Sequence, residues 1–372
     1  MDGLSIKDEL FAIRLLELAR TLQPEGNRVQ FVRFCESHGI RTFLQGFPEL
    51  WKTITDDPPR DGVTPNSQFR MGNAAFCLKQ AAFQEHLLDK LEVLGVRTLA
   101  IKGPSLSSVL YGDITKREFG DIDLLVPPSE IRRVVDFLDA EGLRRTYPGK
   151  LQAGQELAFF RYSKAQSYFH SEFRGSLDLH WRLLSAWVGA DILPFERLWE
   201  RRQVLNHESL RPWASLGNED TIVFLALHGF QDGWPKLKQI LELAVALEVL
   251  DFDWQAMIEH AGPRAVLVER AIELCVHLTG VPHPERMTYY YSGPQAALET
   301  WLEMAKAPKS PQGNLLKPGL WSCHSSEALM RSLQALLNPS IEDITSTELP
   351  LNLVGMYPFI RLFRLVKKAL NR

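Results

Sequence analysis

The feature that most constrains the fold of this chain is the segment GDIDLLV at residues 120–126. Its apolar end predicts a buried strand. Asp121 and Asp123 would then point to one face of that strand, because side chains alternate along it. Two carboxylates held side by side repel each other unless a cation or a proton lies between them. Mg²⁺ is the natural cation for such oxygen ligands and usually arrives with substrate phosphates, so the segment predicts phosphoryl or nucleotidyl transfer.

Length and composition narrow the class of protein. A chain of 372 residues is too long for one compact core and predicts two or three domains. Hydrophobic residues make up 45% and charged residues 23%, as in an ordinary globular protein. The net charge of -3 gives no global signal for nucleic-acid binding, which favours a strongly basic domain. A nucleic-acid partner is therefore disfavoured, and a local basic patch is the alternative that stays open.

The cysteines and the hydropathy pattern bear on location. The four cysteines are scattered and show neither a zinc-ligand spacing nor a dense disulfide framework. The N-terminus lacks the basic and apolar regions of a signal peptide. The sequence has no run of about 18 apolar residues, so a membrane span is not predicted. We therefore expect a cytoplasmic protein without a transmembrane segment.

Sequence patterns divide the chain into three parts. We expect an N-terminal helical region at residues 1–75, a small mixed β-sheet core at 76–185 and a C-terminal helical domain at 186–372, an α+β fold. A turn-rich stretch at residues 56–65 is expected to be a linker. Strands are predicted at residues 96–101, 121–126, 157–162, 166–170 and 176–181, the last two forming a hairpin.

Three acids are candidates for the chemistry. Nucleotidyl transfer needs a divalent metal, a positive cradle for the triphosphate and a carboxylate that activates the acceptor hydroxyl. Asp121 and Asp123 are candidate metal ligands, and Asp178 occupies an inward position of a later strand. Placed beside the first pair, Asp178 would complete a catalytic site of three carboxylates able to hold two metals. Pairing of Asp178 with Arg174 or Arg182 is the plainer alternative.

A phosphate-binding turn is predicted where the first strand ends. Gly103 would let backbone N–H groups approach a phosphate, and the helix that follows would add the partial positive charge of its N-terminus. Lys102 and Arg117 would neutralise triphosphate charge, and Ser105 could donate a hydrogen bond to a phosphate oxygen. A simple turn is the alternative for the Lys-Gly pair.

Four further residues are candidates for a substrate pocket: His180, His228, Trp234 and Lys238. A histidine on an apolar strand is more often packed than reactive, so His180 has a structural alternative. A structural role beside a helix is equally open for His228. Core packing is the ordinary fate of large aromatic residues such as Trp234.

The order of these motifs resembles the polymerase-β-type nucleotidyltransferase superfamily. More narrowly, it resembles a bacterial group described as uncharacterised nucleotidyltransferases, over residues 75–250. The chain departs from the pattern of these relatives in two places. Gly103-Pro104-Ser105 replaces their usual Gly-Ser pair. Asp232 and Glu242 stand where relatives often have a second His and a later Asp. The matching residues are Lys102-Gly103, Tyr111, Arg117, the strand at 121–126, Asp178-Leu179-His180-Trp181, Glu219-Asp220, Leu227-His228-Gly229 and the run at 234–238.

The resemblance implies an activity as well as a fold. Residues 76–185 would be the nucleotidyltransferase core, with Asp121, Asp123 and Asp178 holding Mg²⁺ or Mn²⁺. The enzyme would move a nucleoside monophosphate from a nucleoside triphosphate, such as ATP, to a hydroxyl of a small molecule, sugar or peptide, releasing pyrophosphate. Relatives tend to lie beside genes for natural-product peptides or exopolysaccharide, which suggests natural-product biosynthesis.

Two other functions remain open at this point. A nucleotide-binding sensor would keep the carboxylates but lack an acceptor pocket. A protein that docks on a membrane surface or a partner would use the basic amphipathic helix expected at residues 358–370.

Overall fold

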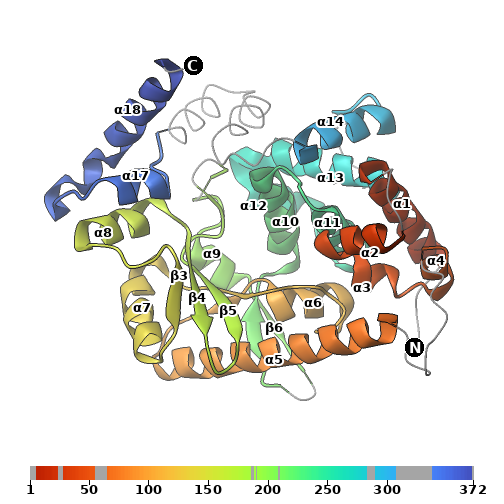
Figure 1. Cartoon of the computed structure of the whole chain (residues 1–372), viewed down its shortest axis with the longest axis horizontal. Coiled ribbons are helices and arrows are strands. Elements are labelled where there is room, and N and C mark those ends of the chain that lie inside the picture. Colours follow the sequence, from red (N-terminus) through yellow and green to blue (C-terminus); the bar gives the residue numbers. More distant parts are fainter. Residues whose placement is uncertain are drawn as a thin grey trace.

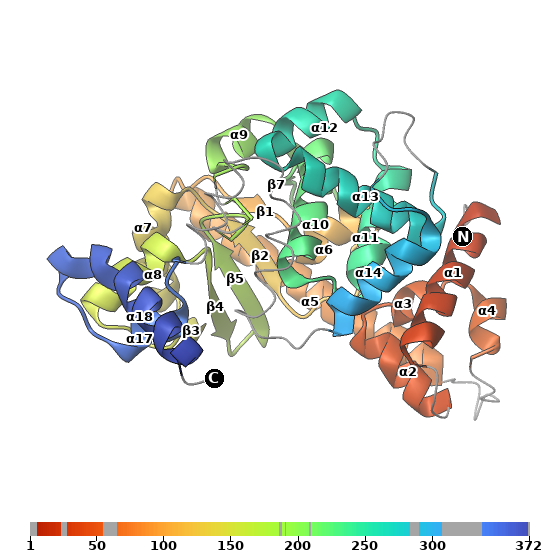
Figure 2. The same cartoon turned by 90° about the horizontal axis from the view of Figure 1, so that it is seen from above.

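A five-stranded mixed sheet forms the centre of the computed structural model, with helices around it (Figures 1 and 2). The structure describes residues 6–23, 28–54, 65–185, 188–189, 191–207, 210–282, 290–306 and 337–370. The predicted α+β class is confirmed. The predicted linker at residues 56–65 lies outside the described residues, apart from Pro65, which begins a helix.

The strands of the main sheet follow the order β1-β2-β5-β4-β3. β2 and β5 are parallel, whereas the other neighbouring strands are antiparallel. β4 and β5 form the predicted hairpin, and a separate two-stranded sheet pairs β6 with β7. The strands are β1 (Leu99–Ala100), β2 (Ile122–Leu125), β3 (Arg144–Tyr147), β4 (Ala165–His170), β5 (Gly175–His180), β6 (Gln203–Leu205) and β7 (Trp213–Ser215).

Alternation along β2 and β5 separates an apolar face from a polar one. Ile122 and Leu124 of β2, with Leu177 and Leu179 of β5, belong to a buried core that also takes in α5 (Pro65–Val93) and α7 (Ile131–Ala140). The residues between them in the sequence point to the opposite face. That opposite face carries the acids of both strands.

The helices that come before the sheet in the sequence and those that come after it share one hydrophobic core. Leu15 and Leu44 from the N-terminal part pack in the same cluster as Phe224 and Ile272 from the C-terminal part. The three-part division at residues 75 and 185 stays a prediction. These helices are α1 (Ile6–Leu22), α2 (Arg28–Ser37), α3 (Arg41–Leu44), α4 (Pro48–Lys52), α6 (Gly103–Tyr111), α9 (Phe195–Glu200), α10 (Asn218–Asp232), α11 (Leu237–Val249), α12 (Trp254–Ala261), α13 (Ala265–Thr279) and α14 (Pro294–Lys306).

The C-terminal helices lie at the opposite end of the molecule from the N-terminal ones (Figure 2). They are α17 (Ile341–Ser346), the 3₁₀ helix η3 (Leu351–Met356) and α18 (Tyr357–Leu370). They pack against α8 (Ala153–Tyr162) through Ile344, Val354 and Tyr357.

The strand predicted at residues 157–162 is wrong, because these residues form the end of α8. A short apolar run fits a buried strand and a buried helix equally well. Here the run serves two cores at once. Phe159 and Phe160 pack under the sheet, while Ala158 faces the C-terminal helices. A helix can direct the adjacent residues Phe159 and Phe160 to the same core, whereas a strand would point them to opposite faces.

Candidate active site

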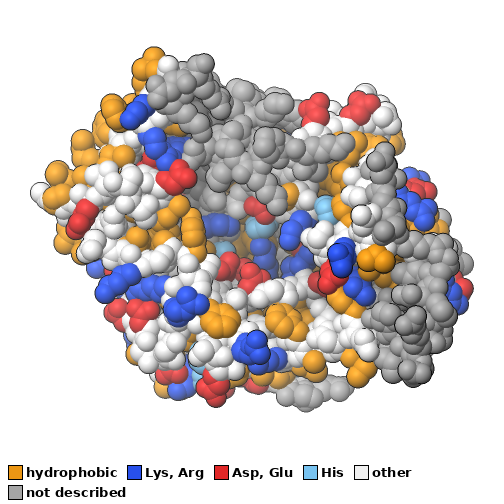
Figure 3. Space-filling model, in the orientation of Figure 1, with side chains coloured by type: hydrophobic (Ala, Val, Ile, Leu, Met, Phe, Trp, Pro, Cys, Tyr) orange, Lys and Arg blue, Asp and Glu red, His pale blue; other side chains and the backbone are white. Residues whose placement is uncertain are grey.

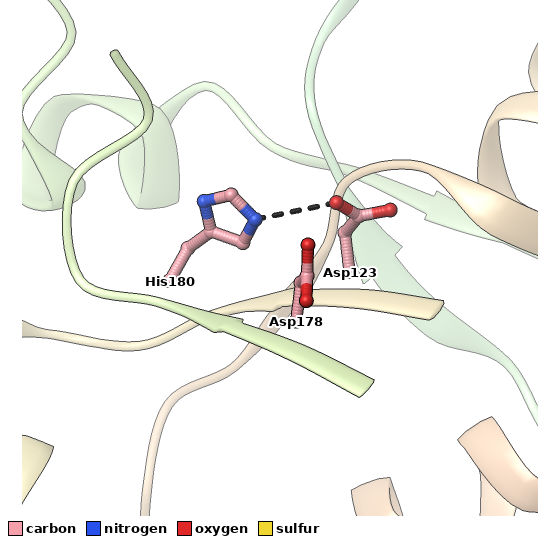
Figure 4. Close-up of side chains that lie close together, drawn as sticks. All are labelled: Asp123, Asp178 and His180. Atoms are coloured by element: carbon pink, nitrogen blue, oxygen red, sulfur yellow. Dashed lines mark hydrogen bonds and ion pairs between the residues drawn. The ribbon is translucent and has the colours of Figure 1, made fainter. Parts of the chain in front are cut away.

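Three polar side chains meet on the polar face of the sheet (Figure 4). Asp123 lies opposite Asp178 in the parallel β2–β5 pair, and His180 lies two residues farther along β5. One ligand atom from each lies within 4.8 Å of the other two. His180 Nε2 lies 3.2 Å from Asp123 Oδ1, and Ser167 Oγ donates a 2.6 Å hydrogen bond to Asp178 Oδ1. The parallel register therefore joins acids that are 55 residues apart in sequence.

Asp121 is not part of the group formed by Asp123, Asp178 and His180, but it lies near enough to interact with both acids, and it differs from Asp123 in its titration. Burial, together with the charges of Asp123 and Asp178, raises the pKa of Asp121 to about 6. Burial also opposes ionisation of Asp123. The hydrogen bond with His180 and the charge of Lys102 outweigh it and lower the pKa of Asp123 to about 2. A proton shared by the acids therefore resides on Asp121, while Asp123 stays ionised.

Lys102 is held in place by a histidine on α10. Its Nζ lies 2.8 Å from His228 Nε2, and His228 Nδ1 lies 3.4 Å from Asp232 Oδ2. Burial and nearby cations, Lys102 first, hold the pKa of His228 well below its usual range, so the ring is neutral. A neutral imidazole has one donor and one acceptor, and an ammonium group only donates. Nε2 therefore accepts from Lys102, and Nδ1–H faces Asp232.

A second group of charges is buried between Arg117 and α11. Arg117 Nε donates to Glu242 Oε1 at 2.6 Å, and the side chains are only 7% and 6% exposed. Lys238 Nζ lies 3.7 Å from the same Oε1 and donates to the backbone oxygen of Glu118. Burial, then the charge of Arg117, lowers the pKa of Lys238 to about 8. Within the described part of the chain, Arg117 Nη1 is buried without a hydrogen-bond partner.

Lys164, just before β4, is a site residue that the sequence analysis missed. Burial, then the charge of Lys102, lowers its pKa to about 8, while Asp232, Asp123 and Asp178 act in the opposite direction. Its side chain therefore lies among the residues above. A single lysine ahead of a strand carries no motif that would have identified it. In Figure 3, Lys and Arg, His, and Asp and Glu side chains gather in a hollow at the centre of this face.

Gly103 occupies a position that only glycine fits. Its φ is +54°, and an added Cβ would lie 2.9 Å from the backbone oxygen of Asp121. The start of α6 is thus pressed against the start of β2. This close approach brings the end of the first strand, with Lys102, next to the acids.

Two residues selected from the sequence lie in the interior instead. Ser105 is fully buried, and its hydroxyl is hydrogen-bonded to the Gln84 side chain at 3.1 Å. Trp234 is also fully buried, with its ring against Gly229 and Phe230. Neither side chain faces the hollow, so neither enters the proposal below.

The donor set fits a divalent metal. The carboxylates of Asp123 and Asp178 and the imidazole of His180 supply oxygen and nitrogen ligands. Mg²⁺ prefers such oxygen ligands, and Mn²⁺ accepts both oxygen and imidazole nitrogen. The group of Asp123, Asp178 and His180 could therefore hold a metal ion.

Acids that can hold a metal beside buried cations suit a protein that handles phosphate esters. The sequence model of a family described as uncharacterised nucleotidyltransferase matches residues 51–280. This match spans more than half of the chain, which therefore belongs to that family. Comparison with curated proteins gives no match. Among the described residues, no helix is long and apolar enough to cross a membrane.

Proposed function

We propose that the protein is a metal-dependent nucleotidyltransferase, which moves a nucleoside monophosphate from a nucleoside triphosphate to an acceptor hydroxyl and releases pyrophosphate. The observation that carries the proposal is the meeting of Asp123, Asp178 and His180, with the positive charges of Lys102 and Arg117 acting on Asp123. Membership of the nucleotidyltransferase family supports it.

The buried cations support a polyanionic substrate. Burial and then the charge of Lys102 lower the pKa of Lys164 and of His228, and burial and then the charge of Arg117 lower that of Lys238. Lys102 and Lys164 are therefore like-charged neighbours, as are Arg117 and Lys238, and each pair disfavours a second positive charge. A triphosphate would relieve the repulsion by accepting charge-assisted hydrogen bonds. Arg117 Nη1, buried without a partner in the described residues, offers one more donor.

Asp121, Asp123, Asp178 and His180 would hold the metal, Mg²⁺ or Mn²⁺. When bound, such an ion would neutralise negative charge that develops on the phosphates during transfer. Lys102, positioned by His228, and the α6 N-terminus at Gly103 would bind the triphosphate.

Asp178 would act on the acceptor. The acceptor oxygen attacks the α-phosphorus, and Asp178 accepts the hydroxyl proton. A new oxygen–phosphorus bond forms, and the bond from the α-phosphorus to its bridging oxygen breaks. Pyrophosphate leaves with the electron pair of that bond. Asp178 already accepts a hydrogen bond from Ser167, which orients its carboxylate.

The test combines binding and turnover. Purified protein is incubated with each of the four α-labelled ribonucleoside triphosphates, Mg²⁺ or Mn²⁺ and a panel of sugar, peptide and small-molecule hydroxyl acceptors. Mn²⁺ binding is measured separately by electron paramagnetic resonance. We expect labelled product and pyrophosphate with wild type, and loss of both product and Mn²⁺ binding with Asp123→Asn. Asp139→Asn, which changes an acid paired with Arg145, is the matched control.

Two results would count against the proposal. Absence of binding of all four nucleotides would refute it outright. Nucleotide and metal binding without transfer to any acceptor, unchanged by Asp178→Asn, would favour a nucleotide-binding sensor instead.

A further inference from the structure

The C-terminal helix α18 is attached to the protein by its charged side. Arg364 Nε lies 2.7 Å from Asp343 Oδ1, and Arg361 Nη1 lies 3.6 Å from Asp343 Oδ2. Asp343 is fully buried, and Tyr357 at the start of the helix is buried too. The polar face of this amphipathic helix is therefore directed toward α17.

The opposite face of α18 is apolar and exposed. Phe359 is 61% exposed and Phe363 is 72% exposed. The spacing of the exposed residues places them along one side of the helix. Contiguous apolar surface of this kind marks an interaction site. The outer stripe consists of Phe359, Leu362, Phe363, Val366 and Leu370, which are 45% to 81% exposed.

The neighbouring 3₁₀ helix adds further apolar surface. Leu351, Leu353 and Met356 of η3 are 45% to 58% exposed. In Figure 3, hydrophobic side chains are frequent along the upper left margin of the molecule, where α18 lies in Figure 1. A surface helix ordinarily turns its apolar side inward, and α18 does the reverse.

Charge indicates which partner would cover the outer stripe. Residues 349–372 contain five Lys or Arg residues and no Asp or Glu, and of the five, Arg361 and Arg364 are paired with acids of α17. Lys367 is exposed beside the stripe. Two copies paired side by side through this helix would bring like charges together, which opposes self-association. An anionic lipid surface instead offers apolar chains to the stripe and negative headgroups to Lys367.

We propose that the outer stripe of α18 docks the protein on an anionic lipid surface. The helix has 14 residues, about 21 Å of length, so it lies along the interface between headgroups and acyl chains. Phe359 and Phe363 insert into the apolar layer, while the ion pairs to Asp343 hold the helix on the protein. This inference is independent of the proposed nucleotidyl transfer.

The experiment is flotation of the full-length protein with lipid vesicles. One set contains phosphatidylcholine with about 30% phosphatidylglycerol, and the other contains phosphatidylcholine alone. We expect the protein to float with the anionic vesicles and much less with the neutral ones. The double variant Phe359→Ser/Phe363→Ser should reduce the bound fraction about tenfold, and Lys367→Glu about fivefold.

The matched control removes two equally exposed apolar side chains elsewhere. Val93 and Met71 of α5 are 88% and 71% exposed, so Val93→Ser/Met71→Ser should leave flotation unchanged. All variants should bind nucleotide and Mn²⁺ as wild type does. Three results would overturn the inference: no flotation of wild type, an equal loss in both double variants, or a dimer in sedimentation that Phe359→Ser/Phe363→Ser abolishes while vesicle binding is absent.

Discussion

The hollow over the sheet and the outer stripe of α18 depart from ordinary protein packing in opposite ways. In the hollow, ionisable groups such as Asp123, Arg117 and Glu242 are almost fully buried. On α18, apolar rings such as Phe359 and Phe363 face outward. Buried charge and exposed apolar surface each cost free energy in the isolated chain. The first cost would be offset by the charged ligand of the proposed function, and the second by the apolar layer of the proposed lipid surface.

The largest expected effect is on turnover. Asp178→Asn should lower kcat about a thousandfold or more, because the acceptor proton loses its base. The KM for the triphosphate should change much less, since the buried cations remain. Steady-state kinetics of wild type, Asp178→Asn and Asp139→Asn measure this. Equal losses in kcat for the two variants would show that the acid on β5 has no special part in the reaction.

The next effect is on stability. Glu242→Gln should lower the free energy of unfolding by about 3 kcal/mol, because Arg117 and Lys238 lose a buried counter-charge. Inorganic triphosphate should restore part of that loss by supplying negative charge. Denaturant unfolding with and without triphosphate measures both. Glu196→Gln, at an exposed pair with Arg97, is the control and should leave stability nearly unchanged. If triphosphate stabilises the two variants equally, the anion does not replace Glu242.

A pH dependence follows from Asp121. Its pKa is raised from 3.8 to about 6 in the folded protein, so its stabilising contribution is present below 3.8 and is lost as pH rises through about 6. Relative to Asp121→Asn, metal-free wild type should lose about 2 to 3 kcal/mol across that window. The pKa of Asp123 is lowered from 3.8 to about 2, so its stabilising contribution is present above pH 3.8 and is lost as the pH falls through about 2. Denaturant unfolding of both proteins in chelator at a series of pH values measures the difference between their free energies of unfolding. A difference that stays constant with pH would contradict the prediction.

Proton uptake on triphosphate binding is a smaller expected effect at the same site. The pKa values of Lys164 and Lys238 are lowered to about 8, so near pH 8.5 both are largely neutral. A bound triphosphate should raise both pKa values and draw in about one proton or more. Calorimetry in buffers of different ionisation enthalpy counts these protons. Uptake should shrink near pH 7, where both lysines are already charged; uptake that grows instead would point to other groups.

The smallest expected effect is on stability, for a substitution on the outer stripe of α18. Phe363→Ala should change the free energy of unfolding by no more than about 0.5 kcal/mol, because the ring is already 72% exposed. The same change at Phe159, which is buried under the sheet, should be strongly destabilising. Thermal unfolding of the two variants measures the contrast. A large loss at Phe363 would mean that its ring packs against the protein in solution.

The sequence predicted the site to the extent that strand alternation and motif order allow. The acids of residues 120–126, the later Asp178 and the Lys-Gly turn were all selected, and the structure brings Asp123 and Asp178 together. Lys164 was missed because it belongs to no motif. Ser105 and Trp234 were selected, yet both side chains are buried, Ser105 on α6 and Trp234 in the turn between α10 and α11. The strand predicted at residues 157–162 failed because two separate cores share that short apolar run.

The amino-acid pattern alone determined that carboxylates alternate with apolar residues along a strand, and that a basic, acid-free amphipathic segment closes the described chain. These are local properties, set by the period of side chains along a strand or a helix. Only the tertiary structure decided that β2 and β5 pair in parallel, that Glu242 neutralises Arg117, and that α18 turns its charges inward. Such contacts join residues far apart in sequence, and which of them form depends on how all the elements pack at once.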